Sequence, residues 1–205
     1  MNRCKVFTVY ITTVLLMNMI SCQSNKEPMD SKTAIDVIFG RTSIRSYRER
    51  PVSKDRLETL VKAGMAAPSA MNKQPWQFII IQDKEILQAL GKDIPTSKMV
   101  SQAAAAIVVC GDMQKAGEGW LQQYWIQDCS AASQNILLAI TDMGLGGVWT
   151  AIYPAPERMK IVSEILHLPE FIIPLNIIPV GYPDGPANPK NKWDPKKIHW
   201  NKFGE

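Results

Sequence analysis

The sequence predicts a single domain in which helices cover both faces of one sheet. Several segments repeat apolar residues at helical spacing, and short continuous apolar runs between them are typical of buried strands. The two kinds of segment alternate along the chain, as they do in helix-flanked sheets. A length of 205 residues, 46% of them hydrophobic, is enough for one substantial core. The direction of the strands does not follow from this pattern.

The first 22 residues differ in composition from the rest. Arg3 and Lys5 precede an apolar run over residues 6–20. This run is short for a membrane span, which needs about 20 residues, and has the proportions of a signal peptide. Ser21 before Cys22 resembles a bacterial lipobox, and the resemblance implies cleavage before Cys22 and lipidation of its thiol. The expected location is therefore extracytoplasmic, as a membrane-anchored lipoprotein.

Two other interpretations of the leader stay open. The apolar run also fits an uncleaved anchor helix. Translation could instead begin at Met29, which would leave the folded domain whole and make the protein cytoplasmic. The expected organisation is a signal segment over residues 1–22, a linker over 23–30 and the domain over 31–205.

Two helices are predicted at the start of the domain. Ser31 or Thr33 caps the first helix, and Gly40 ends it. Ser53 caps the second, and Pro68 stops it. The loop between these helices is rich in arginine.

The middle of the chain is predicted to hold two buried strands and two helices. Residues 77–82 form the first strand, and Asp83 then caps a short helix. Residues 104–110 form the second strand. A long helix follows over residues 120–143.

The last part of the domain begins at Gly144, the expected left-handed C-cap of the long helix. Residues 148–152 are predicted as a strand, and Pro156 opens another helix in its first turn. Residues 175–181 form the last strand. Pro179 inside this strand predicts a sheet edge or a bulge.

Composition excludes several kinds of function. The net charge is +4, and the chain has neither a basic helix interleaved with aromatics nor zinc-ligand spacing, so we expect no nucleic-acid partner and no metal site. No C-x-x-C pair occurs among the cysteines, and Cys110 and Cys129 are expected to be core residues. The two histidines, His167 and His199, are not candidate catalysts.

Two segments carry side chains suited to a phosphorylated, flat ligand. Residues 41–47 place two arginines and several hydroxyl groups in a loop, and arginine forks with serine donors suit phosphate oxygens. Residues 67–76 offer amides, a hydroxyl and Trp76 to a flat heterocycle. A charged surface loop and a packed helix-to-strand turn are the structural alternatives for these two segments.

Two further segments are less specific. Residues 144–151 contain three glycines that permit close backbone approach to a ligand, but the spacing is not G-x-G-x-x-G and a strand follows. A helix end and a tight turn would explain them equally. Lys190 and Lys192 in the tail could reach a phosphate, and a solvated lysine-rich end is the alternative.

Taken together and in this order, the four segments resemble the nitroreductase family. The motifs are R-T-S-I-R-S-Y, P-S-A-M-N-K-Q-P-W, G-L-G-G-V-W and V-G-Y-P, and the similarity covers about residues 33–200. The resemblance implies an α+β fold with a helix-flanked central sheet in three αβα layers. It also implies a homodimer whose C-terminal tail extends onto the partner, with one FMN in each of two interface sites.

The resemblance also implies a role for each matching residue. Arg41 and Ser43 would hold the phosphate of FMN, together with Lys190 and Lys192. Thr42, within the same segment, stands where the family commonly has arginine, which makes this site less positive. Arg45 would lie near the pyrimidine edge of the ring. The other ring contacts would come from Ser69, Ala70 and Asn72 of the partner subunit and from the backbone around Trp149, Thr150 and Ala151.

The function implied is that of an FMN-dependent oxidoreductase with a ping-pong mechanism, from NAD(P)H through the flavin to an electron-poor acceptor such as a nitroaromatic or quinone. The flavin carries the chemistry, so no catalytic side chain is expected. Three alternatives stay open: a lipid-anchored flavoprotein that binds FMN or relays electrons without small-substrate turnover, a dehalogenase-type sister activity, and a surface binding module without flavin.

Overall fold

The computed structural model describes residues 32–204, and those from Thr33 onward form one compact unit. The predicted signal segment, linker, lipidation site at Cys22 and alternative cap at Ser31 lie outside the described residues. Within residues 32–204, no helix combines the length and the apolar character that a membrane crossing requires.

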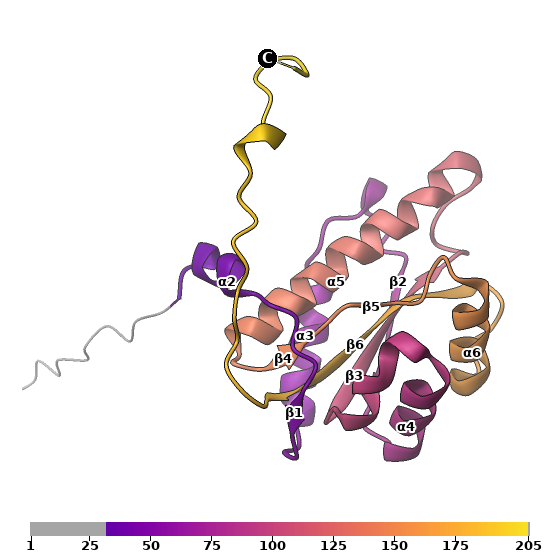
Figure 1. Cartoon of the computed structure of the whole chain (residues 1–205). Coiled ribbons are helices and arrows are strands. Elements are labelled where there is room, and N and C mark those ends of the chain that lie inside the picture. The colour runs from indigo at the N-terminus through magenta and orange to yellow at the C-terminus, as the bar shows by residue number, and fades with distance from the viewer. Residues whose placement is uncertain (1–31, 205) are drawn as a thin grey trace, which may run out of the picture. The chain divides into compact units, whose positions relative to one another are not determined.

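One layer of strands forms the centre of this unit (Figure 1). The sheet order is β1-β6-β3-β2, and β4 and β5 also pair with β6. Every pairing is antiparallel. The strand bounds are β1 Tyr47–Arg48, β2 Trp76–Ile81, β3 Ala105–Asp112, β4 Gly146–Gly147, β5 Thr150–Ala151 and β6 Ile172–Pro183.

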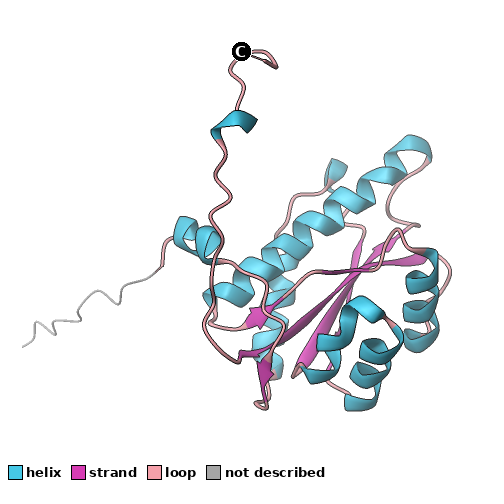
Figure 2. Ribbon diagram, in the orientation of Figure 1, coloured by secondary structure: helices cyan, strands magenta, loops and turns pink. Residues whose placement is uncertain are grey.

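Helices cover both faces of the sheet (Figure 2). Helices α3 and α5 pack together on one face, and α4 and α6 pack together on the other. The α-helix bounds are α2 Ala34–Gly40, α3 Lys54–Met65, α4 Lys84–Asp93, α5 Trp125–Asp142 and α6 Pro156–Leu166. The 3-10 segments within residues 32–204 are η1 Ala70–Asn72, η2 Pro95–Gln102, η3 Gly119–Tyr124 and η4 Pro195–Lys197.

Strand β3 is buried on both faces, and this requires a layer of helices on each side of the sheet. All of its residues from Ala105 to Cys110 have 0% exposure. Alternate side chains point to opposite faces of a strand. Ala105, Ile107 and Val109 therefore join the core under α3 and α5, whereas the residues between them join the core under α4 and α6. The predicted α+β fold with a helix-flanked sheet is confirmed.

Local signals place the helix ends. Thr33 caps α2 in a capping box with Asp36, in which each side chain accepts a backbone N–H of the other residue. Asp83 caps α4 by accepting two backbone N–H groups. Gly144 follows α5 with φ +67°, as a left-handed C-terminal residue should. Ser53 stands at the N-cap of α3, but its side chain makes no capping hydrogen bond.

Other element predictions need correction. The long helix was expected from residue 120, but η3 precedes it and α5 begins at Trp125. The expected strand over 148–152 is instead the pair β4 and β5. Strand β1 and segment η2 were not predicted. A strand of two residues is too short to give a periodic pattern, and the eight-residue η2 has 3-10 geometry, which does not follow the α-helical spacing of apolar residues.

The expectation of a sheet edge at Pro179 is wrong, because β6 lies in the interior of the sheet. Pro179 pairs with Ala106 of β3. On its other side it falls opposite the gap between β4, which pairs at Val180, and β5, which pairs at Ile177. Proline has no N–H to donate, so this interruption of the neighbouring strands leaves no pairing unmet. A bulge does occur in β6, but at Leu175 and not at Pro179, because Val109 and Cys110 of β3 pair with Asn176 and Pro174.

The cysteine prediction is confirmed for Cys110 and Cys129, which are free thiols with 0% exposure. Burial raises the pKa of Cys110 to about 12, and burial is also the main cause that raises the pKa of Cys129. Both thiols are therefore protonated at neutral pH and are not nucleophiles.

Gly111 in β3 should be the glycine least tolerant of a side chain. A Cβ there would lie 2.3 Å from Trp125 Cε3 and 2.9 Å from the Met113 methyl carbon. We expect Gly111→Ala to lower the free energy of unfolding by about 1–3 kcal/mol, since overpacking shifts neighbours. Urea denaturation followed by circular dichroism measures this. Gly40→Ala is the control, because no atom lies within 4 Å of its added Cβ; equal stability of the two variants would contradict the prediction.

Candidate functional site

The arginine-rich loop lies against the glycine segment that follows α5. The Ile44 N–H donates to the Gly147 carbonyl at 3.0 Å. Gly146 has no room for a side chain, because a Cβ there would lie 2.7 Å from Ile44 Cγ2. The glycines therefore allow the loop that carries Arg41 and Ser43 to approach the backbone of residues 146–147.

The start of the C-terminal tail contacts the same arginine-rich loop. The Asp184 N–H donates to the Ser46 carbonyl at 3.0 Å, and the Thr42 hydroxyl donates to the Asn188 carbonyl at 3.3 Å. Asn188 is two residues before Lys190. Three of the four segments singled out in the sequence thus meet: the arginine loop, the glycine segment and the first part of the tail.

A tyrosine and two arginines hold the end of β6, from which the tail departs. Arg56 donates to the Tyr182 hydroxyl at 2.8 Å and also to the Met143 carbonyl at the end of α5. The guanidinium of Arg50 lies 3.9 Å from the centre of the Tyr182 ring. These contacts join α3, α5 and β6, so they fix where the tail begins.

Buried Tyr47 supports the loop from inside. Its hydroxyl donates to the Ile44 carbonyl at 2.8 Å and lies 3.5 Å from the Pro179 carbonyl. Burial raises the pKa of Tyr47, and nearby Arg45 opposes this only in part. The hydroxyl therefore stays a proton donor at neutral pH and keeps the loop attached to β6.

The cations of this region are not consumed by ion pairs. In the part of the chain that the structure describes, the lysines and arginines with a carboxylate within 4.0 Å are Lys115, Lys160 and Lys197. Arg41 is partly exposed, and Arg45, Lys190 and Lys192 are exposed. Their charge is available to an anion that binds between loop and tail.

The segment predicted to approach the ring, Trp149 to Ala151, includes β5, which pairs with β6. Thr150 is 4% exposed, and its hydroxyl donates to the Ile177 carbonyl at 2.6 Å. Its side chain is therefore occupied, and only its backbone can face a ligand. Ala151 is exposed, and its carbonyl accepts a hydrogen bond from Arg158 at 3.0 Å. Sequence reasoning did not identify Arg158.

The fourth segment, which holds Ser69, Ala70 and Asn72, lies elsewhere in the chain. The Ala70 N–H donates to Asp128 in the first turn of α5 at 2.9 Å. Gly144 and the arginine loop lie at the opposite end of this helix. With a rise of about 1.5 Å per residue, Asp128 and Gly144 are separated by roughly 24 Å along the axis. One chain therefore does not place Asn72 beside Arg41.

The backbone of this segment is strained. Met71, Asn72 and Gln74 have φ of 50°, 54° and 49°, in the left-handed region that favours glycine. Each such residue costs about 1–3 kcal/mol, although asparagine tolerates the region better than most. Met71 is 72% exposed, so packing does not explain its conformation. Strain of this kind clusters at ligand-binding sites.

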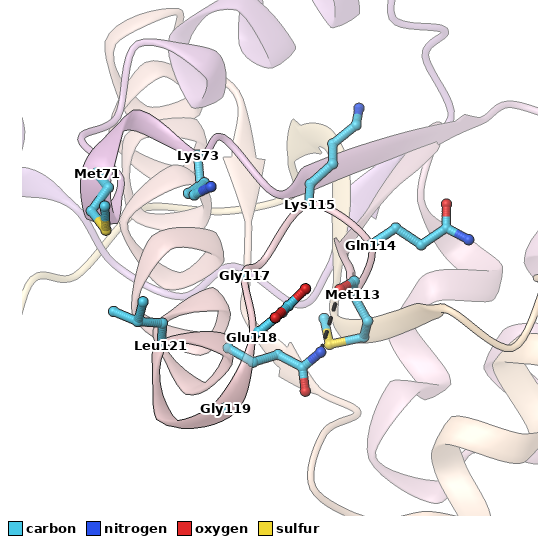
Figure 3. A pocket seen from close by; sticks show the side chains of 10 residues that line it. Met71, Lys73, Met113, Gln114, Lys115, Gly117, Glu118, Gly119 and Leu121 are labelled. Atoms are coloured by element: carbon cyan, nitrogen blue, oxygen red, sulfur yellow. Dashed lines mark hydrogen bonds between the residues drawn. The ribbon is translucent and has the colours of Figure 1, made fainter.

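A pocket of about 620 Å³ adjoins the strained segment (Figure 3). Met71 and Lys73 line it on one side. The other side is the stretch between β3 and α5, which contributes Met113, Gln114, Lys115, Gly117, Glu118, Gly119, Leu121 and Gln122. The pocket does not coincide with the cluster around Arg41. Because it shares the 69–74 segment, it lies beside the predicted ring contacts.

Sequence reasoning missed Asp128 and the pocket stretch. The only signal for Asp128 was an acidic residue in the first turn of a helix, which is common. The glycines at 117 and 119 marked the pocket stretch as irregular, but nothing in the sequence related it to Met71. Across residues 32–204, no group of three or more His, Cys, Asp or Glu side chains is placed to hold a metal ion.

Comparison with known proteins identifies the family. The sequence profile described as the Nitroreductase family matches residues 38–110 and 95–182. The chain belongs to the nitroreductase family. The family resemblance carried by the four sequence motifs is therefore confirmed.

Several relatives in the nitroreductase family are similar over most of this chain. A solved structure from Parabacteroides distasonis, named "putative NADH dehydrogenase/NAD(P)H nitroreductase", is 46% identical with a TM-score of 0.80, over 84% of this chain and 99% of that chain. A protein of the same name from Archaeoglobus fulgidus is 40% identical over 172 residues, 82% of this chain and 98% of its own length. The FMN-dependent nitroreductase of Clostridium difficile is 31% identical with a TM-score of 0.76, over 82% of this chain and 99% of that chain.

Proposed function

We propose that the protein is an FMN-dependent NAD(P)H oxidoreductase. The observation that carries the proposal is the meeting of the Arg41 loop, the glycine segment and the tail, within a fold of the nitroreductase family. Relatives named for FMN-dependent and NAD(P)H nitroreductase activity support it.

The donor set suits FMN. Arg41 offers a forked cation, Ser43 a hydroxyl and Lys190 and Lys192 mobile ammonium groups, which together match a phosphate monoester. Arg45 is a permanent cation that would stabilise negative charge on the pyrimidine side of the ring. FMN, when bound, supplies the redox chemistry by taking hydride from a nicotinamide and passing electrons to an acceptor. The chain supplies binding, orientation and charge.

The active form we propose is a homodimer. Within one chain, Asn72 and Arg41 belong to opposite ends of α5, so a second copy would bring the two sets together. Apolar surface is available for this contact. The side chains concerned are exposed large hydrophobics of α2 and the tail, namely Ile35, Ile38, Phe39, Trp193, Trp200 and Phe203.

We assign the electron acceptor to the pocket of Figure 3. Met71, Met113 and Leu121 supply apolar wall for an aromatic ring, and polarizable methionine sulfur suits aromatic contact. Lys73 has no carboxylate within 4.0 Å among residues 32–204, whereas Lys115 lies 3.8 Å from Asp112. Lys73 is therefore the group that would favour an acidic substituent on the acceptor, such as a carboxylate.

The lipid anchor at Cys22 stays a prediction, which mass spectrometry of the mature N-terminal peptide can test. An anchored enzyme would work outside the cytoplasm. Because NAD(P)H is scarce there, the reductant of an anchored enzyme would be a membrane electron carrier.

A visible flavin spectrum is the first expected result. Purified residues 23–205 should carry FMN or take it up, and Arg41→Ala should weaken its binding. Charge-assisted phosphate contacts contribute about 1.5–3 kcal/mol, so the Kd should rise about tenfold to a hundredfold. Absorbance and fluorescence titration with FMN measure this.

The matched control is Arg48→Ala, which removes an exposed arginine of β1 that belongs to no predicted contact. It should leave the Kd for FMN unchanged. A colourless protein that takes up no FMN, or equal Kd values for wild type and Arg41→Ala, would be incompatible with the proposal.

The dimer predicts a mass in solution twice that of the chain. Light scattering coupled to gel filtration measures it. Removal of residues 193–205 should weaken the dimer, because it deletes three exposed aromatic side chains of the tail. A monomer that still binds FMN tightly would count against a site shared between two copies.

Initial rates test the acceptor assignment and the ping-pong order together. Double-reciprocal plots against NAD(P)H at several acceptor concentrations should give parallel lines. Lys73→Met should raise KM severalfold for 4-nitrobenzoate and leave KM for neutral 4-nitrobenzamide unchanged. Lys98→Met, which changes an exposed lysine of η2, is the control. Intersecting lines would exclude the ping-pong order, and equal effects on both acceptors would exclude the role of Lys73.

A further inference from the structure

Asp128 is a buried carboxylate that the proposed mechanism does not use. It is 6% exposed and lies in the first turn of α5. Among the described residues, no lysine or arginine lies within 4.0 Å of it, since the ion pairs there involve other acids. A buried carboxylate without a cation is costly, and the positive end of an 18-residue helix offsets only part of that cost. The hydrogen-bond partner of this carboxylate therefore bears on its role.

The partner of Asp128 is the segment with strained backbone. Its Oδ1 accepts the Ala70 N–H at 2.9 Å, immediately before Met71 and Asn72 adopt left-handed conformations. The other hydrogen bonds of the segment are internal. Asn72 N–H donates to the Ser69 carbonyl at 3.0 Å, and the Gln74 N–H donates to the Ser69 hydroxyl at 3.0 Å.

Internal hydrogen bonds define the shape of a loop but not its place on the protein. The contact with Asp128 fixes the place of this loop on the protein, because α5, which carries Asp128, is buried against the sheet and against α3. A hydrogen bond to a charged acceptor is about twice as strong as one between neutral groups, which suits an anchor for a strained, exposed segment. Strained conformations persist only where surrounding contacts over-determine them.

We propose that Asp128 is a positioning residue for the ligand-facing segment from Ser69 to Gln74, acting through the Ala70 N–H. The identity of the ligand as FMN rests on the proposed function. Asp128 touches neither cofactor nor substrate in this assignment. It holds Ala70 and Asn72 where a flavin ring of the partner subunit would meet them.

Three variants separate positioning from general stability. Asp128→Ala removes the acceptor. Asp128→Asn keeps an oxygen that can accept the Ala70 N–H. Ser133→Ala is the matched control on the same helix, since it removes a buried hydroxyl that accepts from Asn176 at 2.8 Å and lies outside the segment.

Hydrogen exchange of the full-length protein without FMN, followed by mass spectrometry, tests the anchor directly. In Asp128→Ala, amides of residues 69–76 should exchange about tenfold faster or more, as expected for loss of a charged hydrogen bond. Asp128→Asn should restore most of the protection. Ser133→Ala should lower the melting temperature without faster exchange in this segment. Unchanged exchange in Asp128→Ala, or equal loss in Asp128→Asn, would overturn the proposal.

FMN binding supplies the second readout. Asp128→Ala should raise the Kd for FMN about tenfold and alter the visible circular dichroism of the bound flavin, while Ser133→Ala changes neither. An unaltered Kd and spectrum in Asp128→Ala would overturn the positioning role at the ligand site. If the wild-type protein binds no FMN, the proposed function fails, and the exchange experiment still decides whether Asp128 anchors the segment.

Discussion

The arrangement of the site depends on the pairing of β6 with four other strands. This one strand pairs with β1, β3, β4 and β5. The arginine loop enters through β1, the glycine segment through β4 and β5, and the tail continues from the end of β6 itself. A one-residue shift of register in β6 would exchange the side chains that face the two cores and would separate the three segments. Two hydroxyl contacts reinforce this register: Tyr47 of β1 lies 3.5 Å from the Pro179 carbonyl, and Tyr182 of β6 accepts from Arg56 of α3.

Much of this fold could be predicted from the sequence, and the residues explain why. Thr33 and Asp83 act through their side chains, and Pro156 and Gly144 through the backbone conformation that each favours, so their effect is local. The buried strands were evident as apolar runs. By contrast, the central place of β6 was not, because Pro179 is normally a mark of an edge. Its tolerance depends on the gap between β4 and β5, which is a property of the assembled sheet.

The same distinction applies to the site. The sequence indicated the four segments and their order, since the residue types arginine, asparagine and glycine by themselves indicate which ligand contacts are possible. The family resemblance assigned the Asn72 segment to the partner subunit, but nothing in the sequence placed that segment at the far end of α5. Asp128, Arg158 and the stretch over residues 113–122 were missed because their relevance comes from what they touch. Thr150, named among the contacts, has its hydroxyl committed to Ile177.

The separation of Arg41 and Asn72 along α5 has a genetic consequence under the proposed dimer. A chain damaged at the arginine loop would still offer an intact Asn72 segment, and a chain damaged at Asn72 would still offer an intact arginine loop. When both chains are made in one cell, a mixed pair would contain one competent centre and one that carries both lesions. Two inactive alleles would therefore complement each other. The activity that they restore would be limited by the fraction of dimers that contain one chain of each kind.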